Sequence, residues 1–195
     1  MNAVKSISRG LVISVLMGLL AVTSSIASPT LSISPPVATP AMGSAFDVSV
    51  DISGVSDLFA FQFDLSFDPS VVAATGIDEG LFLQSGGASF FLPGTIDNTL
   101  GVISFTANAL IGAVSGVSGD GPLAIVHLLA VGSGTSVIDL SGAILLDSTL
   151  GDIAFSVSSA RVDVAGTAPE PSSLLLVAAA GLALVNVRGG RVKPN

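Results

Sequence analysis

Hydrophobic and polar residues alternate with a period of two along much of the chain between residues 30 and 164. The longest unbroken alternation is LFAFQFDLSF at residues 58–67, and AFDVSVDIS at residues 45–53 shows the same pattern. Because successive side chains of a strand point to opposite faces of a sheet, this alternation predicts strands with one buried and one solvated face. The side chains predicted to face the core are Phe46, Val48, Val50 and Ile52, followed by Phe59, Phe61, Phe63, Leu65 and Phe67.

Four later stretches are also predicted to be strands. Residues 100–110 form one, and the more continuously apolar residues 122–132 are typical of a central strand. Residues 135–147 predict two short strands on either side of Ser141-Gly142. Within 153–164 the buried face is predicted to hold Ile153, Phe155 and Val157 and then Ala160, Val162 and Val164, so the parity changes at Ser158-Ser159 and predicts a β-bulge.

Turn residues separate these strands, as in FDPS (67–70), SGGAS (85–89) and SGDGP (118–122). In FDPS we expect the Asp68 side chain to cap the turn. Only IDEGLFL (77–83) suggests a helical turn, and Phe90-Phe91 is predicted to be buried. Many short strands at this spacing, with no internal repeat, predict an all-β, antiparallel β-sandwich.

The two ends of the chain differ from this middle region. Lys5 and Arg9 precede an apolar run at residues 11–22, and SSIAS follows, so residues 1–27 are predicted to be a signal peptide cleaved after Ala27. At the other end the apolar run 174–187 would form a helix of about 21 Å, shorter than the ~30 Å hydrocarbon core of a membrane.

Basic residues follow this second run directly, which matches the tendency of cytoplasmic flanks to be positive. The sequence therefore predicts a C-terminal transmembrane helix at about residues 172–187 and a basic tail at 188–195. The resulting division of the chain is a signal peptide at 1–27, a sandwich domain at 28–166 and a C-terminal segment at 167–195.

Negative charge is concentrated in the region between the two basic ends of the chain. Residues 28–168 contain thirteen acids and one base, a net charge of −12, which disfavours binding to nucleic acids. The chain has no cysteine, and this excludes disulfides, thiolate metal sites and cysteine nucleophiles. It also has no Trp and no Tyr, which lowers the expectation of a dedicated sugar-stacking surface.

The C-terminal segment resembles a PEP-CTERM sorting signal. The resemblance rests on Pro169, Glu170 and Pro171, on the short apolar run, and on the terminal cluster containing Arg188 and Arg191. In that family an exosortase, a membrane protease of certain Gram-negative bacteria that make exopolysaccharide or biofilm matrix, reads the segment. The resemblance implies export, an inner-membrane intermediate and a final location at the cell surface or in the extracellular matrix.

The middle region resembles the cohesin family over roughly residues 30–164. The motifs that carry the resemblance, in order, are FQFDLSFDPSVVAATGI, GVISFTANAL, GPLAIVHLLAVGSGTSVIDL and LLDSTLGDIAFSV. Cohesins are jelly-roll β-sandwiches of nine strands that bind dockerin modules through one sheet face. The resemblance implies this fold and, as a partner, a dockerin-like protein.

No arrangement typical of catalysis is present, so we expect a protein that is not an enzyme. His127 is the only histidine and lies in a predicted central strand, where a structural role is expected. Asp147, Asp152 and Asp120 lie in acidic loops and are weak candidates for calcium ligands, although solvated turn residues are the simpler interpretation. We expect no other cofactor.

These observations predict an exported, non-enzymatic bacterial surface or matrix protein that presents a cohesin-like module for adhesion or protein interaction. One alternative is a dedicated dockerin-binding module. The other is a module that binds calcium or carbohydrate, with exopolysaccharide as a candidate partner.

Overall fold

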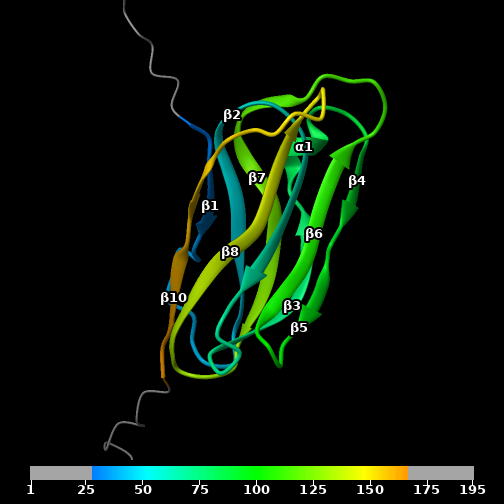
Figure 1. The fold of residues 1–195 in the computed structure, drawn as a ribbon. Helices are drawn as coiled ribbons and strands as arrows, with labels where there is room; N and C mark the ends of the chain where they lie inside the picture. The colour runs from blue at the N-terminus through cyan, green and yellow to red at the C-terminus, as the bar shows by residue number, and fades with distance from the viewer. Residues whose placement is uncertain (1–27, 167–195) are drawn as a thin grey trace, which may run out of the picture.

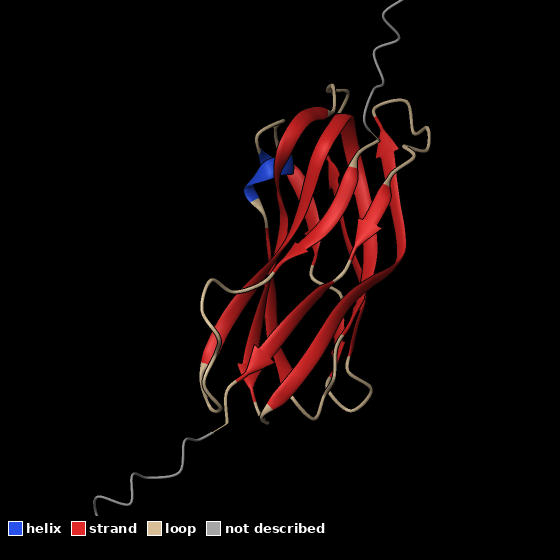
Figure 2. Cartoon of the chain, turned by 90° about the vertical axis from the view of Figure 1, so that its left-hand side faces the viewer, coloured by secondary structure: helices blue, strands red, loops and turns tan. Residues whose placement is uncertain are grey.

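The computed structural model describes residues 28–166. The predicted signal peptide and the predicted C-terminal helix lie outside these residues, and within them no helix is long and apolar enough to span a membrane. The described residues form a β-sandwich whose strands lie in two layers (Figures 1 and 2). Its elements are β1 (Thr30–Ser34), β2 (Ala45–Ser66), β3 (Val72–Glu79), α1 (Leu81–Gln84), β4 (Ser89–Leu92), β5 (Thr95–Asp97), β6 (Val102–Leu110), β7 (Val117–Ala130), β8 (Gly134–Asp147), β9 (Ser156–Ser158) and β10 (Ala160–Val164).

The strand β2 belongs to both layers. Its first part, residues 45–58, pairs with β1 and β7, while residues 60–66 pair with β6 and β8. Leu58 is the point of change, because it is paired with Val117 of β7 and with Asp147 of β8. We call β3, β7, the first part of β2, β1 and β9 the back sheet, and β4 with β5, β6, the second part of β2, β8 and β10 the front sheet.

The core lies between the two sheets and includes most of the side chains that the alternation predicted. Phe61, Phe63, Leu65 and Phe67 are buried, and the rings of Phe61 and Phe63 stack with centroids 5.9 Å apart. Each large side chain that is fully buried contributes about 1.5–3 kcal/mol to stability. The predicted core of this strand is thus confirmed, with Phe59 only partly buried against it.

Three details of the strand prediction were wrong. Residues 134–147 form one strand with an irregularity at Ser141-Gly142, not two strands, because Gly142 adopts a φ of +57° that lets the chain bulge and continue. The parity change at Ser158-Ser159 is not a bulge. It marks the passage of the chain from β9 in the back sheet to β10 in the front sheet, and Val157 is accordingly exposed.

Two local predictions are confirmed. The Asp68 carboxylate accepts hydrogen bonds from the backbone N–H and the hydroxyl of Ser70, so it caps the turn after β2. Both bonds lower the pKa of Asp68 below its usual value because they favour the ionised carboxylate, and the bond from the hydroxyl has the larger effect. The expected helical turn is α1, which begins only after β3 has ended at Glu79.

Polar contacts close the gap between the sheets at the β3 edge. Glu79 of β3 accepts hydrogen bonds from Ser89 of β4 and from the buried Asn108 of β6, the latter at 2.7 Å. Burial opposes ionisation of Glu79, but these hydrogen bonds and one from Gln84 together lower its pKa below the ordinary value. Further along the same edge, the Asn98 side chain exchanges two hydrogen bonds with the backbone of Ala74.

The chain enters and leaves the sandwich at opposite ends (Figure 1). Ser28 lies at the upper end, where its hydroxyl donates a hydrogen bond to the carbonyl of Ala154. The last residues lie at the lower end, where Ala165 exchanges backbone hydrogen bonds with Pro40 and Met42. The described part of the chain therefore ends at the lower end of the domain.

Candidate functional site: an apolar trough on the front sheet

Two rows of side chains cross the outer surface of the front sheet. The strand registers fix each row, because the residues that pair across β4, β6, β2 and β8 lie side by side. The upper row contains Phe90, Ala109, Ala60 and Leu146. The lower row contains Leu92, Ala107, Gln62 and Ile144.

In both rows large hydrophobic side chains stand at the two sides; the middle holds alanines, with the polar Gln62 beside Ala107 in the lower row. The alanines at 60, 107 and 109 form a floor, and β4 and β8 provide walls. The walls are three strand spacings apart, about 14 Å. The depression between them has a volume of 280 Å³. We call this feature the trough.

The walls of the trough are exposed hydrophobic side chains. Phe90 is 61% exposed, and Ile144 and Leu92 are 44% and 38% exposed. The prediction that Phe90-Phe91 is a buried pair was therefore wrong for Phe90. In strand β4 only Phe91 points inward and packs against the core, because neighbouring side chains of a strand alternate between its faces.

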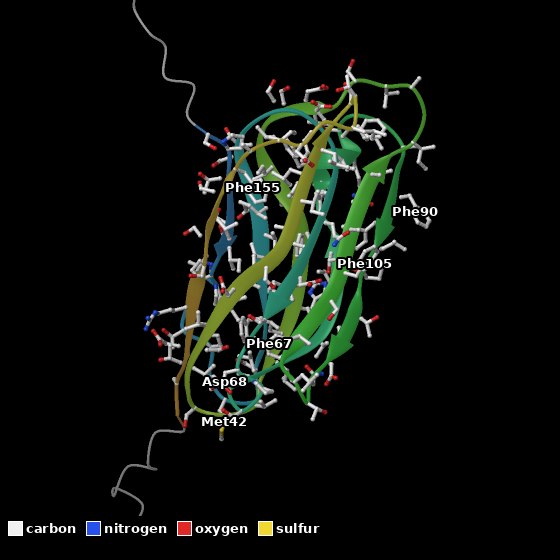
Figure 3. The ribbon with its side chains drawn as sticks, viewed as in Figure 1. Met42, Phe67, Asp68, Phe90, Phe105 and Phe155 are labelled. Atoms are coloured by element: carbon white, nitrogen blue, oxygen red, sulfur yellow. The ribbon has the colours of Figure 1, made fainter. Side chains whose placement is uncertain are left out.

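A strained aromatic residue lies just below the trough. Phe105 of β6 has a φ of +60°, which is rare for a bulky residue, and its side chain is 53% exposed. It sits in a bulge, since Phe63 pairs with Thr106 whereas Leu65 pairs with Ile103. The Asp64 carboxylate accepts a hydrogen bond of 2.7 Å from the Phe105 N–H, which the bulge has removed from the strand ladder. Phe90 and Phe105 are labelled on the same side of the molecule in Figure 3.

The outer surface of the back sheet has the opposite character. Asp47, Ser49 and Asp51 of β2 lie on it, together with His127 of β7 and Asp78 of β3. Asp51 accepts hydrogen bonds from Ser34 and Ser49. The apolar character of the trough is therefore not a general property of both sheets.

His127 connects three strands on this polar surface. Its Nδ1 lies 2.7 Å from Asp47 Oδ1, and its Nε2 lies 3.0 Å from Asp78 Oδ2. The hydrogen bond to Asp47, followed by that to Asp78, raises the pKa of His127 above its ordinary value because both carboxylates favour the imidazolium. These contacts agree with the structural role predicted for His127.

The three candidate calcium ligands do not form one group. Asp147 accepts hydrogen bonds from Thr149 and Gly151 in its own turn, Asp120 accepts one from Gly54, and Asp152 is exposed and bridges to Leu146. Within residues 28–166 no three His, Asp or Glu side chains are arranged to hold a metal ion. The calcium assignment stays a prediction.

Asp57 is hydrogen-bonded to two loops at the upper end of the trough, the loop before β7 and the turn after β8. It accepts hydrogen bonds from the Ser148 hydroxyl at 2.7 Å and from the Gly116 N–H at 2.7 Å. Both bonds lower the pKa of Asp57, and the bond from Ser148 has the larger effect. The pKa of Asp147 is lowered in the same way, most by the hydrogen bond from the Thr149 hydroxyl and next by that from the Gly151 N–H. Asp147 pairs with Leu58, the next pair of this register beyond Ala60 and Leu146, so both carboxylates belong to the loops that border the upper row.

Sequence reasoning did not find the trough. The alternation places Ala60 and Gln62 on the outward face of their strand. Their neighbours on β4, β6 and β8 depend on how strands distant in sequence pair with one another, which the alternation does not show. Cleavage after Ala27 and the sorting residues Pro169, Glu170, Pro171, Arg188 and Arg191 lie outside the described residues, so they stay predictions.

The family model for the cohesin domain matches residues 31–164, which is more than half of the chain. The chain belongs to the cohesin family. Cohesin domains are protein-interaction modules without catalytic activity and are typically extracellular or attached to the cell surface. No curated protein sequence matches the chain.

Solved cohesin structures share this fold at low sequence identity. A non-cellulosomal cohesin from the archaeon Archaeoglobus fulgidus is 15% identical, with a TM-score of 0.55, and the match covers 77% of this chain and 98% of that one. The sixth cohesin of scaffoldin B from Acetivibrio cellulolyticus, solved in complex with a Cel5 dockerin mutant, is 20% identical, with a TM-score of 0.57 and coverage of 71% and 99%. A type II cohesin module from an adaptor scaffoldin of the same organism is 13% identical, with a TM-score of 0.59 and coverage of 78% and 99%.

Proposed function

We propose that this cohesin is an exported bacterial surface or matrix protein that binds a dockerin-like protein through the trough. The observation that carries the proposal is the trough itself, an uncharged depression with exposed hydrophobic walls on a domain whose net charge is −12. Contiguous exposed apolar surface is typical of a binding site for another protein. The dockerin complexes of similar cohesins support the choice of partner.

The expected energetics also favour a protein partner. Phe90 and Phe105 offer large aromatic side chains, which are frequent among the residues that dominate binding energies at protein interfaces. Phe105 is presented by a strained backbone, and strain of this kind persists mostly at functional sites. The calcium and carbohydrate alternatives have no comparable support in the described residues.

A binding experiment with matched variants tests the trough. Immobilised residues 28–166 would be exposed to the exported proteins of the source bacterium, and captured proteins would be identified by mass spectrometry. Ala109→Glu places a charge on the trough floor. Leu100→Glu places the same charge on a side chain that is 71% exposed in the turn before β6.

We expect the unmodified domain and Leu100→Glu to capture the same protein carrying a dockerin module, and Ala109→Glu to lose it while keeping its thermal midpoint. Capture by Ala109→Glu at the unmodified level would refute the trough as the binding surface. Failure of the unmodified domain to capture any dockerin-bearing protein would refute the choice of partner.

The export and sorting part of the proposal rests on the two ends of the sequence. Intact-mass measurement of the protein recovered from its own host tests both ends at once. We expect an N-terminus at Ser28 or within two residues of it, and a C-terminus that no longer includes the apolar run and basic tail. An intact chain would contradict this proposal while leaving the binding experiment unaffected.

A further inference from the structure

We infer that Asp64 and Phe105 form a binding site for an arginine side chain of the partner, at the lower end of the trough. This site would recognise one basic group beside the apolar contacts that the trough itself makes. That the arginine belongs to a dockerin-like protein rests on the proposed function, whereas the chemistry of the site rests on its residues alone.

The Asp64 carboxylate is only partly used inside the domain. Its Oδ1 accepts the hydrogen bond of 2.7 Å from the Phe105 N–H. Its Oδ2 has no hydrogen-bond partner among residues 28–166, and this atom stays accessible to solvent. Because the two oxygens of a carboxylate together can accept about four hydrogen bonds, most of the acceptor positions of Asp64 are open to a ligand.

Gly142 keeps the space beside the free oxygen open. An added Cβ at this position would lie 3.1 Å from Asp64 Oδ2, which is closer than an ordinary contact. The φ of Gly142 is +57°, a conformation that glycine adopts without strain. The two neighbours of β2 are both irregular beside Asp64, β6 at Phe105 and β8 at Gly142, and this leaves one oxygen of the carboxylate uncovered.

No cation within the described residues neutralises Asp64. Arg161 of β10 is the one arginine or lysine between residues 28 and 166. The two salt bridges found in this range both belong to His127 on the back sheet. A basic group from a partner would therefore complement Asp64, and charge complementarity of this kind fixes the register and the choice of a partner at an interface.

The site is continuous with the trough. Ala60, Gln62 and Asp64 are successive outward residues of β2, so the carboxylate lies one step below the floor of the trough. Leu92 lines the trough and also lines, together with Phe105, a second depression of 240 Å³. The apolar surface therefore extends from the trough to Phe105, and a partner seated in the trough would pass over Asp64.

An arginine side chain matches the carboxylate and the aromatic ring together. Its planar guanidinium donates hydrogen bonds to carboxylates and stacks on aromatic rings, and its aliphatic stem packs on apolar surface. The Phe105 N–H is itself the donor to Asp64, so one side chain can reach both the ring and the free oxygen. Since a lysine ammonium has no planar surface to stack, arginine is the expected residue.

A titration with small probes tests the site without the partner. Residues 28–166, labelled with ¹⁵N, would be titrated with N-acetyl-arginine amide and separately with N-acetyl-citrulline amide, in which a neutral urea group replaces the guanidinium. We expect the arginine probe to cause saturable chemical-shift changes at the Phe105 and Gly142 amides, and the citrulline probe to cause none. The amide of His127, on the opposite sheet, should not shift.

Matched variants separate this site from the general negative charge of the domain. Asp64→Asn keeps an oxygen that accepts the Phe105 hydrogen bond but removes the charge, and it should weaken binding of the arginine probe about fivefold. Phe105→Leu should weaken it about threefold, because the ring is lost. Asp152→Asn removes the same charge from an exposed position after β8 and should leave the affinity unchanged.

Several results would overturn the inference. They are equal binding of the citrulline probe, undiminished binding of the arginine probe to Asp64→Asn or to Phe105→Leu, and an equal loss in Asp152→Asn. Equal affinity for N-acetyl-lysine amide would overturn the choice of arginine.

The capture experiment judges the proposed function separately. Specific binding of the arginine probe without any captured dockerin-bearing protein would overturn the proposed function alone. Capture of that protein by Asp64→Asn at the unmodified level, with no binding of the arginine probe, would overturn the inference alone.

Discussion

Phe105 gives a stability prediction of unusual sign. In an ordinary strand, replacing alanine by glycine costs about 0.5–1 kcal/mol, because glycine loses more freedom on folding. At position 105 the φ of +60° reverses this order, since a Cβ in the left-handed region costs about 1–2 kcal/mol and glycine has none. Phe105→Gly should therefore be more stable than Phe105→Ala by about 0.5–1 kcal/mol.

Both variants lose the phenyl ring, so the free energy of its contacts cancels when their stabilities are compared. Urea unfolding of residues 28–166, followed by far-ultraviolet circular dichroism, measures the two free energies of unfolding, and the melting temperatures should differ by about 2–4 °C. Ala107→Gly, two residues further along β6 in an ordinary strand conformation, is the control and should lose about 0.5–1 kcal/mol. If Phe105→Ala proves as stable as Phe105→Gly, the backbone at this position is not strained and the reasoning fails.

Three other positions give measurable changes. Phe63→Ala should cost about 3–5 kcal/mol in urea unfolding, because Phe63 is fully buried; a loss under 1 kcal/mol would contradict its place in the core. Gly80→Ala should lower the melting temperature, since an added Cβ would lie 2.2 Å from the Pro122 carbonyl oxygen; an unchanged melting temperature would show that the loop adjusts freely. The raised pKa of His127 stabilises the fold fully below its unfolded value of about 6.5, and this contribution disappears as pH rises through the folded pKa. His127→Gln should remove that alkaline loss of stability, and an identical pH profile would refute the role of the two aspartates.

The layers of the fold could be predicted because the period-two pattern is local. Phe61, Phe63 and Leu65 occur at alternating positions, and no knowledge of the partner strands is needed to place them in a core. The role of Asp68 was accessible for the same reason, since its hydrogen bonds go to a residue two positions away.

The remaining errors come from contacts distant in sequence. Val157 follows the alternation, yet it is exposed because β9 joins the edge of the back sheet beside β1. Alternation allows only one of Phe90 and Phe91 to face the core, and the pairing of β4 with β6 decides that it is Phe91. The trough needs four strands in register, and the bulge that presents Phe105 needs Asp64 from another strand. No local pattern carries this information.

The position of β10 determines how the domain would carry a pulling force. In a chain held by its C-terminal segment and pulled by a partner in the trough, tension would enter at β8 and leave through β10. These strands are joined by five antiparallel residue pairs, and the hydrogen bonds of such a ladder lie perpendicular to the strands. The load would therefore act along the strands and be shared by the whole ladder, instead of opening one hydrogen bond at a time. The parallel bridge between Ala41 and Ala165 lies just beyond this ladder, where the tension leaves the domain, and would reinforce its last link.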